Sequence, residues 1–323
     1  MPVVPRLVPP ALVEPVVRGL VGAIDVGDGP TTEQLTVLRA VTVHLWERPD
    51  LDPAALVGTD PAATATAIVD RAARRRFHEI LFTLEACRHP LTSEQVDRVE
   101  EYCTALAVTG PDLALFRTAV AEGTERAAAD FARFLDASIE ARHEAGLTPR
   151  ASADRPEPGL AARVAAFADL PDGSLGRAYL AFYERHGIGL PGAVAHSMNH
   201  FFVAHDMTHV IAGIEPTAAG EIALSAFQMA MDDTPTNVGA LLCSLVVHEA
   251  GLGSSPTFGT EARVLADADA ARLLGEELAR GARCTADCST ADHFALAPLA
   301  LAEVRRRFGV EAPADPADGH HHW

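Results

Sequence analysis

Lysine is absent from this chain of 323 residues, so its 26 Lys or Arg positions are all arginine. A guanidinium group does not form a Schiff base with a carbonyl substrate, and a phosphate-binding P-loop needs a lysine amine. The sequence therefore excludes lysine-based covalent catalysis and P-loop chemistry. It also lacks G-x-S-x-G, G-x-G-x-x-G and H-E-x-x-H motifs, which argues against the common hydrolase, dinucleotide and metalloprotease sites.

Positive charge and cysteine are both scarce. The formal net charge is −18, so no nucleic-acid partner is expected, because binding to phosphates needs clustered cations. The five scattered cysteines are typical of reduced thiols rather than of a disulfide framework. No uninterrupted apolar stretch approaches the roughly 20 residues of a membrane-spanning helix. We expect a cytoplasmic protein, and a peripheral contact with a membrane surface stays open.

Strong helix formers dominate the composition. Alanine, leucine, arginine and glutamate are abundant, whereas aromatic residues make up only 6 %. This composition predicts an all-α protein, and the length favours two domains. Prolines, glycines and charges gather in residues 146–160, which we interpret as a linker. It separates a helical domain, residues 1–145, from a second helical domain, residues 161–311, and residues 312–323 form a disordered tail.

A weak internal repeat marks the first domain. Residues 27–35 and 88–96 each place a Thr or Ser before an acidic first turn, about sixty residues apart, as at a capped helix start. Two such helix–turn–helix pairs resemble the TerB-like domain of tellurite-resistance proteins, in which acidic residues of the turn can bind metal. Here Asp25 and Asp28 remain in the first turn, whereas the second turn has His89. The plainer alternative is a pair of capped helices in a scaffold or partner-binding domain.

The second domain contains a metal-binding pattern, His205-Asp206-x2-His209-x11-Glu221. At about 100° per residue, His205 and His209 share one face of a helix, and Asp206 lies within the same arc. Two imidazoles and a carboxylate suit zinc. Gly213 would end this helix, and a hairpin could return Glu221 as a fourth ligand. For the two histidines alone, an ordinary packed pair is the alternative.

The whole pattern resembles the signature of the Coq-four family of ubiquinone-biosynthesis proteins. The resemblance spans about residues 163–310 and includes three further segments, LPDGSLGRAY (170–179), GEIAL (220–224) and LAEVRRRFGV (301–310). It implies a helical fold around an apolar channel for a polyprenylated ring, with zinc at the mouth of the channel. It implies as zinc ligands His205, Asp206, His209 and Glu221.

The family is associated with replacing the ring carboxyl carbon of a ubiquinone precursor by a hydroxyl, and with organising a biosynthetic complex. This chain departs from the family at the pocket mouth. Residues 200–206 read HFFVAHD where the family has arginine and glutamate, and Ser225 and Gln228 replace a lysine and a glutamate. The mouth is therefore more apolar, which favours a different hydrophobic substrate, in bacterial specialised metabolism.

Five side chains are candidates for the chemistry and the pocket. His205 and His200 are the candidate catalytic residues, with His200 in a proton-transfer role. Phe201, Phe202 and Phe227 are the candidate pocket residues. The alternative for His200 and for the phenylalanines is ordinary core packing, because aromatic residues at helical spacing are usually buried.

Two functions follow from this pattern. The first is a zinc-dependent enzyme that modifies a hydrophobic ring or isoprenoid-type small molecule by decarboxylation, hydroxylation or cyclisation. The second is a non-catalytic lipid- or quinone-binding scaffold with a structural zinc, since four protein ligands close a zinc site. The partner we expect is a hydrophobic small molecule. A homo-oligomer or a biosynthetic complex stays open.

Overall fold

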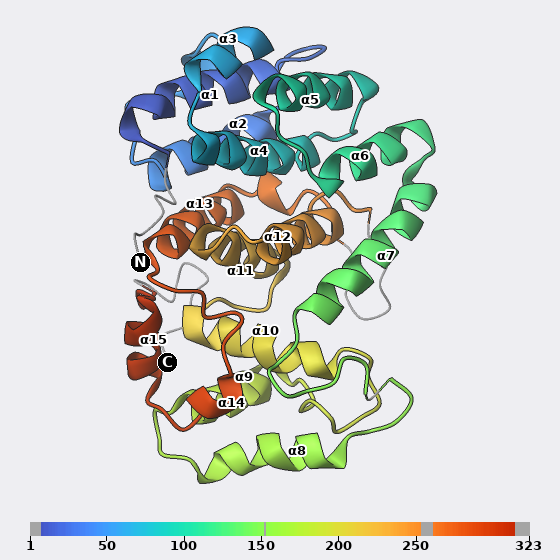
Figure 1. Cartoon of the computed structure of the whole chain (residues 1–323), viewed down its shortest axis with the longest axis vertical. Helices are drawn as coiled ribbons and strands as arrows, with labels where there is room; N and C mark the ends of the chain where they lie inside the picture. Colours follow the sequence, from blue (N-terminus) through green and yellow to red (C-terminus); the bar gives the residue numbers. More distant parts are fainter. Residues whose placement is uncertain (1–7, 152, 253–260, 314–323) are drawn as a thin grey trace. The chain divides into compact units, whose positions relative to one another are not determined.

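The structure is a computed structural model that describes residues 8–151, 153–252 and 261–313 (Figure 1). Within these ranges the chain forms fifteen α-helices and three short 3-10 helices. The same residues contain no β-strand, so the predicted all-α fold is confirmed. None of the described helices is long and apolar enough to cross a membrane. The predicted disordered tail lies outside the described residues from position 314 onward.

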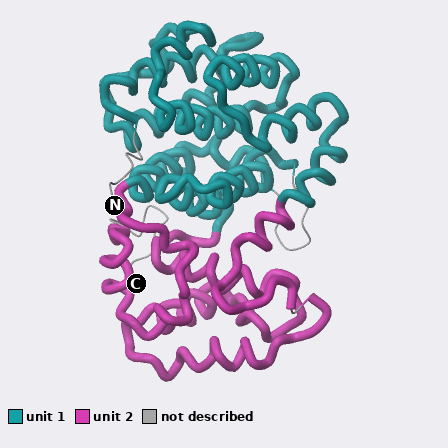
Figure 2. Tube along the Cα trace, in the orientation of Figure 1, with its two compact units in different colours: residues 1–134, 217–282 teal, residues 135–216, 283–323 magenta. Residues whose placement is uncertain are grey.

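The chain divides into two compact units, and each is described by itself (Figure 2). Unit 1 comprises Met1–Phe134 and Thr217–Ala282. Unit 2 comprises Leu135–Pro216 and Arg283–Trp323. The predicted linker, residues 146–160, lies within unit 2 and includes the beginning of a helix at Pro158.

Unit 1 is a bundle of helices drawn from two stretches of sequence. Its elements are α1 (Pro10–Ile24), α2 (Thr32–His44), η1 (Pro53–Ala55), α3 (Pro61–Ala67), α4 (Arg71–Ala86), α5 (Ser93–Leu106), α6 (Pro111–Ala121), most of α7 (Thr124–Ala141), α11 (Ala218–Met231), α12 (Pro235–His248), η3 (Val264–Ala266) and nearly all of α13 (Ala268–Arg283). The later stretch joins this unit because α12 packs on α4 and η3 packs on α2.

The repeat predicted in the first domain is visible in unit 1, as two capped helices joined through their glutamines. Thr31 caps α2 and accepts a hydrogen bond from the backbone N–H of Gln34, and Thr92 caps α5 in the same way. The side chain of Gln34 donates to the carbonyl of Leu84, 3.0 Å away, and that of Gln95 donates to the carbonyl of Ala23, 2.9 Å away. Gln34 of α2 thus binds the end of α4, and Gln95 of α5 binds the end of α1. Each glutamine contacts the first helix of the other half of the repeat.

Unit 2 surrounds one buried helix. Its elements are the end of α7, α8 (Pro158–Ala165), η2 (Ala166–Asp169), α9 (Leu175–His186), α10 (Asn199–Ala212), α14 (His293–Leu296) and α15 (Leu301–Phe308). Helix α10 packs on α9, α14 and α15. Its C-terminal carbonyls at Ile211 and Val210 accept hydrogen bonds from the Arg305 guanidinium. Gly213 ends the helix, as the sequence predicted, and it adopts the left-handed conformation with φ of 75°.

Candidate metal centre

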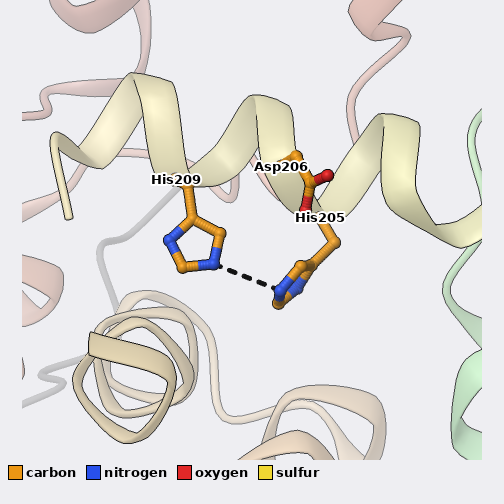
Figure 3. A group of neighbouring side chains, drawn as sticks. All are labelled: His205, Asp206 and His209. Carbon is orange, nitrogen blue, oxygen red and sulfur yellow. Dashed lines mark hydrogen bonds between the residues drawn. The ribbon is translucent and has the colours of Figure 1, made fainter. Parts of the chain in front are cut away.

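Helix α10 brings together three of the four predicted metal ligands. The candidate ligand atoms of His205, Asp206 and His209 all lie within 4.8 Å of one another. Figure 3 shows both imidazoles leaving the same side of the helix, as their four-residue spacing requires. Asp206 and His209 are buried, and His205 is half-buried. A single helix therefore presents two nitrogen donors and one carboxylate in a small, largely enclosed volume.

The ring of His209 is oriented for binding a metal through Nε2. Its Nδ1 lies 3.0 Å from the carbonyl oxygen of Ile214, which the turn at Gly213 places beneath the ring. A carbonyl only accepts, so Nδ1 carries the proton and Nε2 carries a lone pair. That Nε2 lies 3.2 Å from Nε2 of His205. Two nitrogens bound at about 2.0–2.1 Å to a tetrahedral zinc ion lie about 3.3 Å apart, so this spacing fits the metal.

Two phenylalanine rings flank the histidine pair within unit 2. The ring of Phe201 stacks on His205, with centroids 4.7 Å apart and planes 21° apart. The ring of Phe182 stacks on His209, with centroids 5.8 Å apart and planes 24° apart. Apolar walls on both sides restrict the imidazoles to few orientations and lower the local dielectric, which strengthens their interaction with a cation.

The carboxylate of Asp206 is held by a chain of tyrosines on α9. The hydroxyl of Tyr183 donates to Asp206 Oδ2, and the hydroxyl of Tyr179 donates to that of Tyr183 over 3.2 Å. Burial, reinforced by the charge of Asp206, raises the pKa of both tyrosines well above the usual range. Both hydroxyls therefore stay protonated and serve as donors. Partners of this kind fix the orientation of a carboxylate ligand.

Removing the Tyr183 hydroxyl is expected to weaken both the fold and the metal site. In Tyr183→Phe the buried Asp206 carboxylate loses a charge-assisted hydrogen bond, which costs about 1–3 kcal/mol of stability. Zinc affinity should fall about tenfold, because the carboxylate loses its orienting partner. Denaturant unfolding of metal-free protein and competition with a chromophoric chelator measure the two effects.

Tyr179→Phe is the matched control, since it removes only a bond between two neutral hydroxyls. It should cost about 1 kcal/mol or less and leave zinc affinity nearly unchanged. Equal losses of zinc affinity in the two variants would show that the Tyr183 hydroxyl does not orient Asp206.

The fourth predicted ligand belongs to the other compact unit. Glu221 lies in the first turn of α11 in unit 1, half-buried, and Thr217 caps that helix by accepting from the backbone N–H of Gly220. Its participation with the three residues of α10 stays a prediction. The same holds for Phe227 as a pocket residue. It is fully buried in unit 1, with the Arg280 guanidinium 5.7 Å from the centroid of its ring.

The remaining candidates lie on the first turns of α10. Phe201 is buried against His205, whereas Phe202 is half-buried and contacts the ring of His196, with centroids 5.1 Å apart. His200 is buried, and its Nδ1 accepts a hydrogen bond from the backbone N–H of Arg150 over 3.1 Å. It is not one of the three residues whose donor atoms cluster. Burial lowers the pKa of His200, which keeps the ring neutral near pH 7.

Sequence reasoning missed the partners that orient the ligands. Tyr179 and Tyr183 follow an ordinary helical pattern, which predicts that they are buried but not what they contact. Ile214 orients His209 through its backbone carbonyl, which every residue type has, so the sequence does not predict this role. Only the glycine at 213, which ends the helix, hinted that the chain returns beneath His209.

Comparisons with known proteins leave the family of the chain undetermined. No protein-family model matches the chain, and no curated protein matches it. Among solved structures it is similar to the crystal structure of a "Putative ubiquinone biosynthesis protein" from Nostoc punctiforme. The two share 20 % identity at a TM-score of 0.33, over 74 % of this chain and 98 % of that one. A likeness this low decides nothing about chemistry, so the centre rests on its own residues.

Proposed function

We propose that the chain binds zinc through His205, Asp206 and His209 of α10, with Glu221 as the fourth ligand. The observation that carries this proposal is the pair of Nε2 atoms 3.2 Å apart, with His209 held in the metal-binding tautomer by the Ile214 carbonyl. The Tyr183 hydroxyl on Asp206 supports it, because ligands of catalytic and structural zinc sites carry such outer partners.

We further propose that the protein is an enzyme that modifies a hydrophobic ring or isoprenoid-type small molecule in bacterial specialised metabolism. The resemblance of the signature to the Coq-four family supports the substrate class. The apolar side chains before His205 support an uncharged group at the pocket mouth. Zinc in this position supplies Lewis acidity toward a carbonyl, carboxylate or phenolate oxygen.

The protein's own residues have separate tasks in this proposal. His209 and Asp206 are fixed by bonds to Ile214 and Tyr183, so they keep their geometry when a substrate arrives. Phe201 covers one face of His205 and excludes water from it. His205, the half-buried member of the three, is the ligand best placed to face a bound molecule.

The alternative function is a lipid- or quinone-binding scaffold whose zinc only stabilises the helices. The burial of Asp206 and His209 favours it, because structural sites are enclosed. The two functions differ in what happens to a bound ring when zinc is removed. Binding to an enzyme of this kind depends on the metal, whereas binding to the scaffold does not.

A binding experiment with a short-chain benzoquinone tests the proposed function. Zinc-loaded full-length protein should bind the quinone at least about tenfold more tightly than protein stripped with a chelator, since a metal–oxygen contact adds to the apolar contacts. Equal binding in the two forms would favour the scaffold. The absence of quinone binding in both would contradict the proposed substrate class.

Two phenylalanine variants distinguish a residue that contacts the ligand from a residue of the packed core. In Phe202→Ala the quinone affinity should fall about tenfold while stability changes by about 1 kcal/mol, because that ring is only half-buried. In Phe201→Ala stability should fall by about 3 kcal/mol or more, because a buried ring is removed. Thermal melts with and without the quinone measure both. A large loss of stability in Phe202→Ala, with unchanged quinone affinity, would assign that ring to the core.

A further inference from the structure

Unit 1 contains a second cluster of metal-ligand types, far from the α10 residues in the sequence. Glu33 lies in the first turn of α2, His89 lies in the turn between α4 and α5, and Glu249 follows the last residue of α12. One donor atom from each lies within 4.8 Å of the others. Three separate elements of the unit thus converge on one point.

The cluster is enclosed and its atoms face one another. His89 Nε2 lies 2.9 Å from Glu249 Oε1 and 3.6 Å from Glu33 Oε1. The exposed fractions of the side chains are 0 % for Glu249, 6 % for Glu33 and 19 % for His89. Two carboxylates therefore face the same imidazole nitrogen at a point that is largely excluded from solvent.

One carboxylate oxygen in the cluster lacks a hydrogen bond. The single proton of His89 Nε2 serves Glu249 Oε1, and the other oxygen of Glu249 accepts from the backbone N–H of Leu265 over 2.7 Å. Glu33 Oε1 is buried and has no hydrogen-bond partner among the described residues. Its other oxygen lies 3.5 Å from Arg263 Nε, on a side chain that is 62 % exposed. A buried carboxylate oxygen without a hydrogen bond is costly, and His89 Nε2, 3.6 Å away, is too far to donate one.

The surrounding backbone holds the three elements in place. A capping box at Thr31 fixes the first turn of α2, where Glu33 lies. Arg88, next to His89, donates to the carbonyls of Gly29 and Val26 over 3.2 Å and 3.1 Å. The carbonyl of Glu249 accepts from the backbone N–H of Arg263 over 2.9 Å. The donor atoms are thus positioned without a bound ion, as a preformed site requires.

We propose that Glu33, His89 and Glu249 bind a divalent first-row transition-metal ion, at a second site distinct from the one on α10. One imidazole nitrogen and two carboxylate oxygens suit zinc, manganese or iron(II). The ion would join α2, the α4–α5 turn and the end of α12. An ordinary buried Glu–His–Glu cluster without metal is the alternative outcome.

Zinc binding by the full-length chain tests the second site. His209→Ala removes a ligand of the first site, and alanines at His320, His321 and His322 remove the histidine run at the C-terminus. In this background we expect one tightly bound equivalent of zinc in equilibrium dialysis. Adding Glu33→Gln or His89→Gln should weaken that binding at least about 100-fold, because each removes a direct ligand.

Glu94→Gln is the matched control. Glu94 occupies the equivalent position in the first turn of α5 but is exposed, so its replacement should leave zinc binding unchanged. Glu249→Gln is a further variant that should also weaken zinc binding. If Glu249→Gln does not fold, the results for Glu33→Gln and His89→Gln decide the test. The second site is ruled out if the background protein holds no zinc, or if Glu33→Gln binds zinc as tightly as Glu94→Gln. The centre on α10 would be unaffected by that result, because it is tested by the difference between wild type and His209→Ala.

Discussion

Glu144→Ala is expected to lower the free energy of unfolding by about 3–5 kcal/mol, because it removes a fully buried carboxylate that accepts two hydrogen bonds. Both side chains of the Glu144–His293 pair are 0 % exposed, and Glu144 Oε2 lies 2.7 Å from His293 Nδ1. The other carboxylate oxygen accepts from the backbone N–H of Phe294 over 3.2 Å. Alanine would leave two buried donors without a partner. Each such donor costs about 1–3 kcal/mol.

Urea unfolding followed by circular dichroism measures this loss, and two variants calibrate it. Glu311→Ala breaks the exposed pair with Arg283 and should shift the midpoint little, since exposed pairs contribute about 0–1 kcal/mol. Glu144→Gln keeps an oxygen that can accept from Phe294 and should fall between the other two. A loss in Glu144→Ala no larger than that in Glu311→Ala would contradict the role of this pair in unit 2.

Glu144 also shows what local sequence patterns cannot reveal. It stands two residues before the predicted linker and is completely buried, which nothing in its neighbouring sequence indicates. Its partner His293 lies 149 residues later in the chain. Composition and periodicity describe neighbours within a helix or turn, so they carry no information about a contact over this separation.

Features set by local chemistry were predictable. The all-α fold followed from helix propensity, and the starts of α2 and α5 followed from Thr31 and Thr92 as caps. The geometry of His205 and His209 followed from helical periodicity, and the end of α10 followed from Gly213. Each of these depends on residues within one or two turns of one another.

Features set by tertiary packing were not predictable. The cluster of Glu33, His89 and Glu249 draws on three elements, and no spacing in the sequence marks it. The hydroxyl of Tyr183 reaches Asp206 from another helix. The grouping of α11 to α13 with the N-terminal helices likewise depends on packing between α12 and α4.

His209→Ala is expected to abolish metal binding on α10, and this is the largest functional effect we predict. The variant removes one of two nitrogen donors and the ring that the Ile214 carbonyl orients. Zinc affinity at the site should fall at least about 100-fold, since no other described residue of the cluster can replace a nitrogen ligand. His186→Ala is the matched control in the same unit, because His186 pairs with Glu215 and is not a candidate ligand.

The most direct test of the metal centre is the zinc content of purified full-length protein in which His320, His321 and His322 are replaced by alanine. Elemental analysis after dialysis against a weak chelator should find one equivalent of zinc per chain less in His209→Ala than in wild type. His186→Ala should match the wild type. Equal zinc in wild type and His209→Ala would contradict the assignment of His205, Asp206 and His209 as a metal centre.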